Sequence, residues 1–229
     1  TRLKILEAFE RSTQERGVCA HGEVHLVRRV AGYKKIRYYT HENVGYGDIR
    51  LPDQEMHTTA VWWQLRPEAL EQAFATRQQA LDGFLGASYA MHQVAALESM
   101  SEPNDLGRAV GDGEAEWFAT VEANGRGQLR RADGSLLDLD ATDRFRPAVF
   151  LYDNYPGGIG LSAPLFDRRG RIVLRAHDLI DRCGCRYGCP SCVGPILASD
   201  EQRGHSAKSV ALTVLNLLRQ VDAEGADDA

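Results

Sequence analysis

The chain has 229 residues, of which 43% are hydrophobic and 26% are charged, and its formal net charge is -5. It is long enough for one substantial core, and no apolar run approaches the roughly 18 residues that a membrane span needs, so we expect one globular domain and no membrane partner. Four acidic residues of the last eight account for most of the charge, and without them 28 acidic residues face 27 basic ones, which excludes a body covered in phosphate-seeking positive charge.

Residues 1–10 predict a helix, and because the chain starts without Met we expect it to be part of a longer protein. From about 18 to 66 the chain is rich in strand-favouring residues between Gly and Asn breaks, with its strongest run at Thr58–Trp63. This pattern predicts antiparallel strands, and therefore a β-rich amino-terminal part of the domain.

One segment of the β-rich part combines basic and aromatic side chains. On a strand, four of its residues would share one face: Tyr33, Lys35, Arg37 and Tyr39. The basic side chains could neutralise phosphates while the aromatic rings stack on the nucleobases of a single strand. This face is therefore a candidate nucleic-acid-binding site. The alternative is an ordinary strand with solvated basic side chains.

The part from about 67 to 221 is predicted to be helical and metal-binding. Pro67 suits the first turn of a helix, and an apolar stripe continues from Leu70 to Met100. Gly83 and Gly86 imply either a break or close helix packing within this stripe, so two helices are predicted. The Gly-, Asp- and Asn-rich residues 101–146 are expected to be loops around one strand at Trp117–Val121.

A strand, a glycine turn and a helix are predicted next. The short apolar run Val149–Tyr152 fits a strand buried on both faces, and Asp153, Gly157 and Gly158 follow it. Backbone amides in such a turn can hold an anion. The alternative is structural, with glycines that only permit the turn and an aspartate that closes it.

A further helix is predicted from Asp167 to Asp181, and a last helix from Ala207 to Val221, before an acidic tail at 222–229. Between the two helices lies a C-x-C-x3-C-x2-C cluster formed by Cys183, Cys185, Cys189 and Cys192. A tight loop can turn four such thiolates onto one structural Zn²⁺ ion per chain. Disulfides between cysteines this close would be strained, but an iron–sulfur cluster also uses four thiolates and remains an alternative. Arg182 and Arg186 would then either neutralise the negative charge of the zinc–thiolate site or face solvent.

Several segments together resemble the zinc-binding C-terminal domain of MrfA- or YprA-type superfamily 2 DEAD/DEAH-box DNA helicases. The resemblance covers nearly the whole chain and depends most on two segments, Tyr152–Gly160 (YDNYPGGIG) and Cys183–Pro195 (CGCRYGCPSCVGP). Weaker support comes from the segments Gly32–Ile36 (GYKKI), Leu51–Pro52, Thr58–Trp62 (TTAVW), Ala80–Leu97 and Asn104–Gly107 (NDLG).

The resemblance implies that the four cysteines are zinc ligands and that the parent protein is an ATP-driven 3′-to-5′ DNA helicase in DNA repair. ATP would bind only to the parent's motor domains, because this chain contains no G-x-x-x-x-G-K-[ST] phosphate loop. No residue is therefore predicted to be catalytic. The expected role is an accessory domain that braces the helicase core or helps to position DNA.

The expected partners are helicase motor domains in cis or a helicase subunit in trans, with DNA a further candidate. The alternative function is a stand-alone DNA-binding or helicase-partner subunit, for example in an anti-phage defence complex. Reduced thiols indicate a cytoplasmic location. The predicted fold class is mixed α+β, in one domain that spans residues 1–229.

An enzymatic function has weaker support from the sequence. A metal-assisted nuclease would need two acidic residues to meet in space, and Asp105 and Asp153 are the candidates. Other side chains capable of metal or proton chemistry complete no recognised motif: Cys19, His21, His25, His177 and Asp178.

Overall fold

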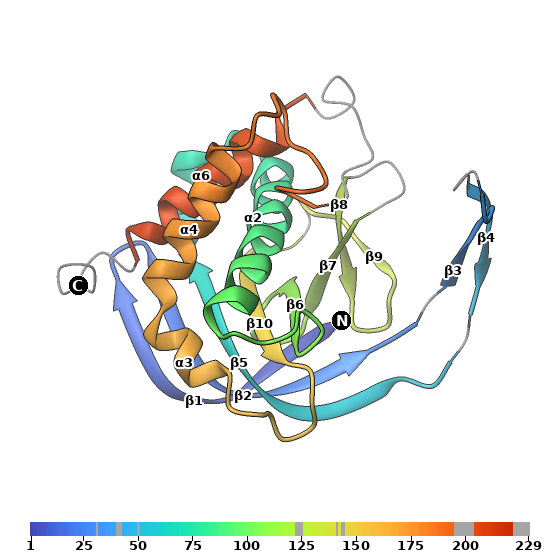
Figure 1. Ribbon diagram of the computed structural model, residues 1–229, viewed down its shortest axis with the longest axis horizontal. Coiled ribbons are helices and arrows are strands. Elements are labelled where there is room, and N and C mark those ends of the chain that lie inside the picture. Colours follow the sequence, from blue (N-terminus) through green and yellow to red (C-terminus); the bar gives the residue numbers. More distant parts are fainter. Residues whose placement is uncertain are drawn as a thin grey trace.

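The computed structural model describes residues 1–30, 32–39, 43–49, 51–121, 126–140, 142, 145–194 and 204–221. Within these residues, eight antiparallel strands form one sheet in the order β1-β2-β5-β10-β6-β7-β8-β9 (Figure 1). Their bounds are β1 Arg2–Gln14, β2 Gly17–Arg28, β5 Gln54–Leu65, β6 Leu106–Gly111, β7 Trp117–Val121, β8 Gly127–Arg131, β9 Leu136–Leu137 and β10 Ala148–Asp153. A separate hairpin joins β3 Gly32–Ile36 to β4 Asn43–Asp48 and lies apart from the helices (Figure 1).

The large sheet is strongly curled. Near its start, β1 returns to the turn between β6 and β7, where the Ile5 backbone N–H donates to the Gly113 carbonyl at 2.9 Å. An isolated antiparallel β-bridge pairs the backbones of Lys4 and Glu114 at the same place. The curl gives the sheet an inner face, on which Leu26, Trp62 and Phe150 form one of two apolar cores.

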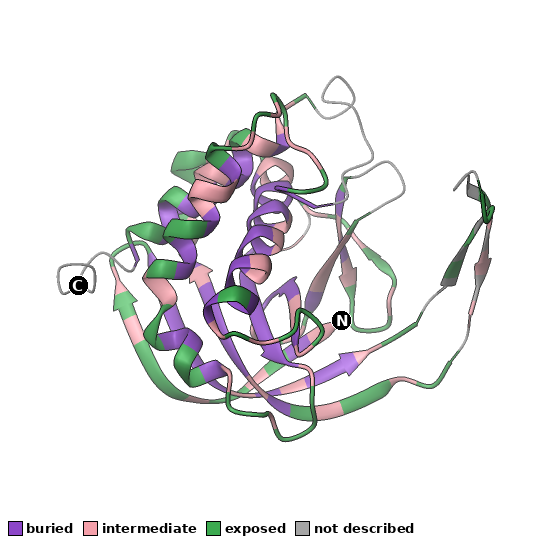
Figure 2. Ribbon diagram, viewed as in Figure 1, coloured by how far each residue is buried: buried purple, intermediate pink, exposed green. Residues whose placement is uncertain are grey.

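Helices cover the other face of the sheet and enclose the larger core (Figures 1 and 2). They are α1 Pro67–Ala73, α2 Arg77–Glu98, α3 Ser162–Asp167, α4 Arg169–Asp181 and α6 Ala207–Arg219. Trp62 and Trp63 show how the cores are separated, because neighbours on a strand point to opposite faces and each of these rings enters a different core. The predicted mixed α+β class is confirmed.

The predicted break near Gly83 and Gly86 is absent, and both glycines lie inside the continuous α2. The other expectation, close packing, holds instead. A Cβ atom on Gly83 would lie 2.6 Å from the Val210 carbonyl oxygen of α6, so only a glycine lets the two helices approach this closely. The chain breaks earlier, between α1 and α2, where the Thr76 side chain accepts a hydrogen bond from the Gln79 N–H and caps α2.

The helix predicted at residues 1–10 is wrong, because this segment is the first half of β1. Register shifts after Ile5 and after Ala8 interrupt the two-residue alternation of apolar side chains that would have indicated a strand. Pairing with the whole of β2 overrides the local helical preference, so strands begin at Arg2 rather than near residue 18.

The expectation of loops around a single strand at 101–146 is also wrong in part. The strand at Trp117–Val121 is confirmed as β7, but β6, β8 and β9 also lie in this stretch. Gly107 explains the error for β6, since a Cβ atom there would lie 2.1 Å from the Tyr152 ring of β10. This glycine is thus required by packing within a strand rather than by a loop.

The carboxy-terminal predictions are confirmed with small shifts of boundary. The buried strand is β10, and the helix expected after the glycine turn is α3. The helix expected from Asp167 to Asp181 is α4, which begins at Arg169. The cysteine loop joins α4 to α6, as predicted, while the acidic tail 222–229 lies outside the described residues. None of the described helices combines the length and hydrophobicity needed to span a bilayer.

Candidate metal centre

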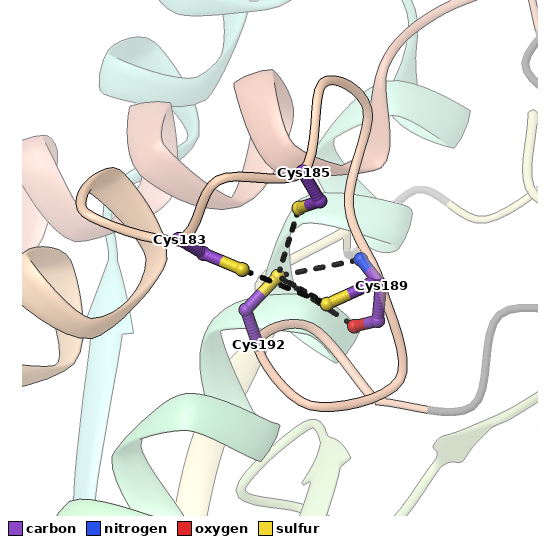
Figure 3. Close-up of side chains that lie close together, drawn as sticks. All are labelled: Cys183, Cys185, Cys189 and Cys192. Atoms are coloured by element: carbon purple, nitrogen blue, oxygen red, sulfur yellow. Dashed lines mark hydrogen bonds between the residues drawn. The ribbon is translucent and has the colours of Figure 1, made fainter.

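The four cysteines lie in a compact loop, here called the knuckle (residues 183–192), that begins directly after α4 (Figure 3). Two hydrogen bonds to one backbone carbonyl connect the knuckle to the start of α6. The Tyr187 carbonyl accepts hydrogen bonds from the Lys208 N–H at 2.8 Å and from the Ser206 hydroxyl at 3.1 Å. Ser206 is also the N-cap of α6, so the start of this helix and the tip of the knuckle hold one another in place.

The sulfur atoms point toward a common centre (Figure 3). All four lie within 4.8 Å of one another, and the pairs Cys183–Cys189, Cys185–Cys192 and Cys189–Cys192 are each 3.6 Å apart. A tetrahedral zinc ion with bonds of about 2.3 Å places its sulfurs about 3.8 Å apart, which agrees with these separations.

The same separations decide between the alternatives. A disulfide needs its sulfurs about 2 Å apart, and all four of these cysteines are free. An iron–sulfur cluster places several iron and sulfide ions between its cysteine ligands and needs a wider cage. The site fits a single ion with four thiolates, which is the closed donor set of structural zinc.

The thiols do not titrate alike. Burial, together with the adjoining thiols of Cys185 and Cys189, raises the pKa of the Cys192 thiol to about 12. Although burial also acts against the Cys189 thiolate, its hydrogen bond from the Ser191 N–H and the thiols of Cys183 and Cys192 lower the pKa of Cys189 to about 7. Four thiolates this close would repel one another, and a bound cation would supply the positive charge that neutralises them.

A residue missed by the sequence analysis supports the knuckle. From the first turn of α6, the Lys208 ammonium donates to three carbonyl oxygens, those of Cys183 at 2.7 Å, Asp181 at 3.2 Å and Cys185 at 3.3 Å. The sequence contained a signal for this role. A lysine in the first turn of a helix is repelled by the positive end of the helix dipole, so its presence there indicates an acceptor outside the helix.

The two arginines considered for neutralising the charge of the zinc site have other contacts. Arg182 is 80% exposed and pairs with Asp178 at 3.4 Å, while the Arg186 guanidinium lies over the Tyr187 ring, 4.9 Å from its centroid. For Arg182 the solvent-facing alternative therefore holds, and Lys208 provides the nearby positive charge.

The knuckle is part of the larger core rather than an appendage. Cys192 and Val193 are buried in it, and the three other cysteines pack against it while half-buried. Because α4, α6 and α2 meet at this core, an ion at the knuckle would fix the carboxy-terminal helices to the rest of the molecule.

The amide groups of the glycine turn after β10 bind a carboxylate of the chain itself, that of Asp153. One oxygen of the fully buried Asp153 carboxylate accepts from the N–H groups of Ile159 at 2.7 Å, Gly160 at 3.0 Å and Leu161 at 3.2 Å, and from the Thr59 hydroxyl at 3.1 Å. Gly157 and Gly158 supply the left-handed backbone of the turn, with φ of 79° and 75°. This geometry favours the structural interpretation over an external anion site.

The candidate nucleic-acid residues lie on the β3–β4 hairpin and just beyond β3. Tyr33 and Lys35 are on β3, where the Lys35 ammonium lies 5.8 Å from the centroid of the Tyr33 ring. Arg37 and Tyr39 follow the end of β3 at Ile36, so they do not extend the strand face as expected. The four side chains are all exposed, Tyr39 by 88%.

The acidic pair considered for a nuclease has structural contacts instead. Asp105 accepts from the Tyr155 hydroxyl at 2.9 Å and from the Glu102 N–H at 3.0 Å, while Asp153 caps the glycine turn. In the part of the chain that the structure describes, the cysteines form the one group of three or more metal-binding side chains that converge.

Comparisons with known proteins agree with this geometry. Residues 87–193 match the family described as the MrfA Zn-binding domain. The chain is 31% identical over 214 residues to the uncharacterized ATP-dependent helicase YprA of Bacillus subtilis (strain 168), an alignment that covers 93% of this chain and 24% of YprA.

Two solved structures are similar over nearly the whole chain. The crystal structure of the DUF1998 helicase MrfA bound to DNA matches with a TM-score of 0.61 and 28% identity, over 95% of this chain and 24% of that one. A second crystal structure of MrfA matches with a TM-score of 0.50 and 26% identity, over 93% and 23% of the two chains. The chain thus spans about a quarter of the length of the relatives it matches.

Proposed function

Because residues 87–193 belong to the MrfA Zn-binding domain family, we propose that this chain is the non-motor, zinc-binding part of an ATP-dependent DNA helicase. The observation that carries the proposal is the cluster of four cysteine sulfurs within 4.8 Å of one another, and all four cysteines lie within the matched residues. The relatives support a motor fused in the same chain, since the matched region is about a quarter of one longer protein. The sequence contains no phosphate loop of its own.

In this function the zinc site acts as a brace rather than as a catalyst. Four thiolates leave a zinc ion no open position for water or substrate. What the ion would supply is rigidity, because it joins the end of α4 to the start of α6 and both helices pack on α2. We propose that the resulting platform holds the motor domains in register or positions DNA against them, within the reducing cytoplasm that free thiols favour.

The test uses the full-length parent helicase. The double substitution Cys185→Ser with Cys189→Ser removes half of the ligands, and a Cys19→Ala variant is the matched control because Cys19 is a buried cysteine outside the knuckle. We expect unwinding of a partial duplex to fall at least about tenfold, while DNA affinity changes by less than about threefold. Unchanged unwinding in the double variant would contradict the bracing function.

A second candidate function is direct contact with single-stranded DNA through the β3–β4 hairpin. It is favoured by the exposed Tyr33, Lys35, Arg37 and Tyr39, which combine basic and aromatic side chains on a hairpin that lies apart from the helices (Figure 1). Basic side chains neutralise phosphates and release their counterions, and exposed aromatic rings offer surfaces on which nucleobases stack.

Charge reversal separates this function from that of an ordinary solvated hairpin. We expect Lys35→Glu with Arg37→Glu to lower affinity for single-stranded DNA about tenfold and to reduce the salt dependence of binding by about two charges. The control is Arg11→Glu with Arg16→Glu, an equal change of charge at exposed positions on and just after β1. Equal losses in both variants would indicate a general charge effect and would remove the hairpin site.

A further inference from the structure

A second group of metal-binding side chains lies on the helix-side face of the sheet, away from the knuckle. His25 on β2 and His57 on β5 are directly opposite one another in the strand register. Their ring centroids are 5.2 Å apart, and the ring planes are inclined by 59°. The helical layer does not cover this position, since the His57 side chain is 64% exposed and that of His25 is 29% exposed.

Each imidazole also has a carboxylate partner on the opposite strand. His57 Nδ1 lies 3.2 Å from Glu23 Oε1, and His25 Nε2 lies 3.3 Å from Glu55 Oε2. Where a neutral ring donates from the nitrogen that faces its glutamate, the other nitrogen carries a lone pair. That leaves His57 Nε2 and His25 Nδ1 as two acceptors on neighbouring strands.

From this arrangement we propose a second metal site, at which His25 Nδ1 and His57 Nε2 bind one divalent first-row transition ion. Imidazole nitrogens are preferred ligands of zinc, nickel and copper, and two rings on a tetrahedral ion have centroids about 5 Å apart, as these do. Glu23 and Glu55 take the place that carboxylates commonly have around metal-binding histidines, where they fix the tautomer and make the free nitrogen more basic.

This site differs from the knuckle in what its ion can do. Two protein ligands leave the remaining coordination positions to water or to a donor from outside the chain, whereas the knuckle is closed. The site is therefore weaker and exchangeable, and it is independent of the proposed helicase function. An ordinary explanation is two surface ion pairs that only hold β2 against β5, and this explanation predicts no ion binding.

The experiment starts from the 229-residue chain loaded with one equivalent of zinc, so that the knuckle is filled. Titration with Ni²⁺ is followed by calorimetry and by NMR of the histidine rings, because the paramagnetic ion broadens signals close to it. The expected result is one additional ion per chain, with selective broadening of the His25 and His57 ring signals. Binding of no additional ion, or broadening centred on other histidines, would overturn the proposal. These titrations need only the wild-type chain.

Substitutions then test the ligands separately from their partners. We expect His57→Gln and His25→Gln each to lower Ni²⁺ affinity at least about tenfold, while Glu23→Gln with Glu55→Gln causes a loss of about tenfold with both ring ligands retained. His177→Gln is the control, because His177 lies on α4 beside Asp178 and should not change the affinity. Equal affinity in the wild type and in both ligand variants would exclude His25 and His57 as the site.

Discussion

Lys208 contributes to the metal centre without touching the metal. Its ammonium gathers three carbonyl oxygens from the end of α4 and the first half of the knuckle, so it sets the path of the backbone that carries Cys183 and Cys185. It also places a positive charge next to the knuckle, where zinc bound by four thiolates would have a negative formal charge. Partners of this kind orient ligands and tune affinity in metal sites generally.

The substitution Lys208→Met keeps the length of the side chain and removes its charge and its three hydrogen bonds. We expect zinc affinity to fall about tenfold or more, as measured by competition with a chromophoric chelator under reducing conditions. Arg182→Met is the matched control, since Arg182 adjoins the knuckle but is 80% exposed and pairs only weakly with Asp178. Equal affinity in the two variants would show that the Lys208 contacts do not support the ligands.

Asp112 gives stability a pH dependence that is independent of the metal. It accepts from the N–H groups of Glu116 at 2.9 Å and Trp117 at 3.2 Å, yet burial outweighs these bonds and raises its pKa from 3.8 to about 6. A carboxyl with a raised pKa in the folded chain stabilises it fully below pH 3.8, and that contribution is lost as the pH rises through about 6.

The difference between the wild type and Asp112→Asn isolates this contribution. As the pH falls from about 7 to about 5, the free energy of unfolding of the wild type should rise relative to the variant by about 1 kcal/mol, after allowance for solvent screening. Urea unfolding of both zinc-loaded proteins at several pH values measures the difference. A constant difference across this range would mean that Asp112 titrates alike in the folded and unfolded chains.

The ligands of the metal centre could be predicted from the sequence, but their support could not. The four cysteines are close along the chain, so their spacing alone restricts them to one small loop. Lys208 is 16 residues beyond Cys192, and only the packing of α6 against the knuckle brings it to the carbonyls. Arg182 and Arg186 are near in sequence, but their side chains turn elsewhere.

At the scale of elements, the turn between β10 and α3 depends on one carboxylate. The Asp153 side chain satisfies three backbone N–H groups that lead into α3, and the Thr58 hydroxyl binds the Asp153 and Tyr155 carbonyls at 2.7 and 2.9 Å. β5, β10 and the start of α3 are thereby joined at one point. A buried carboxylate with several N–H donors is among the stronger polar arrangements in proteins.

Asp153→Asn tests how much this junction stabilises the fold. The amide retains one acceptor oxygen but loses the charge, and we expect the free energy of unfolding to fall by about 2 kcal/mol in urea titrations. Asp178→Asn is the control, because its exposed ion pair with Arg182 should contribute less than about 0.5 kcal/mol. Similar values for the two variants would remove the special role of the Asp153 carboxylate.

Elements with a local signal were predicted correctly, and those that depend on distant partners were not. Pro67 marks the start of α1, and the continuous apolar run of β10 identifies a strand buried on both faces. β1 carries bulges that hide its alternation, so only its pairing with β2 reveals it as a strand. Gly107 resembles a loop residue until the Tyr152 ring beside it is known.

At the scale of the molecule, the two cores differ in how they depend on the metal. The core inside the curled sheet is made entirely of strand residues and includes Trp62 and Phe150. The larger core lies under the helices and contains Cys192 and Val193 together with Val214 of α6. Loss of the ion should therefore affect the larger core directly, and the core inside the curled sheet only through the sheet that the two cores share.

Removal of zinc provides the test of this division. Structural zinc supplies roughly 10–16 kcal/mol of apparent binding free energy in small peptides, so a knuckle without metal should open and release the adjoining ends of α4 and α6. In the reduced, chelator-treated chain we expect amide hydrogen exchange to speed up at least about 100-fold in those helices, while β2, β5 and β10 stay protected because the inner core contains no knuckle residue. Uniform loss of protection would mean that the whole fold requires the ion. Unchanged exchange in α4 and α6 would mean that the helices pack without it, and the zinc brace would then have no structural basis.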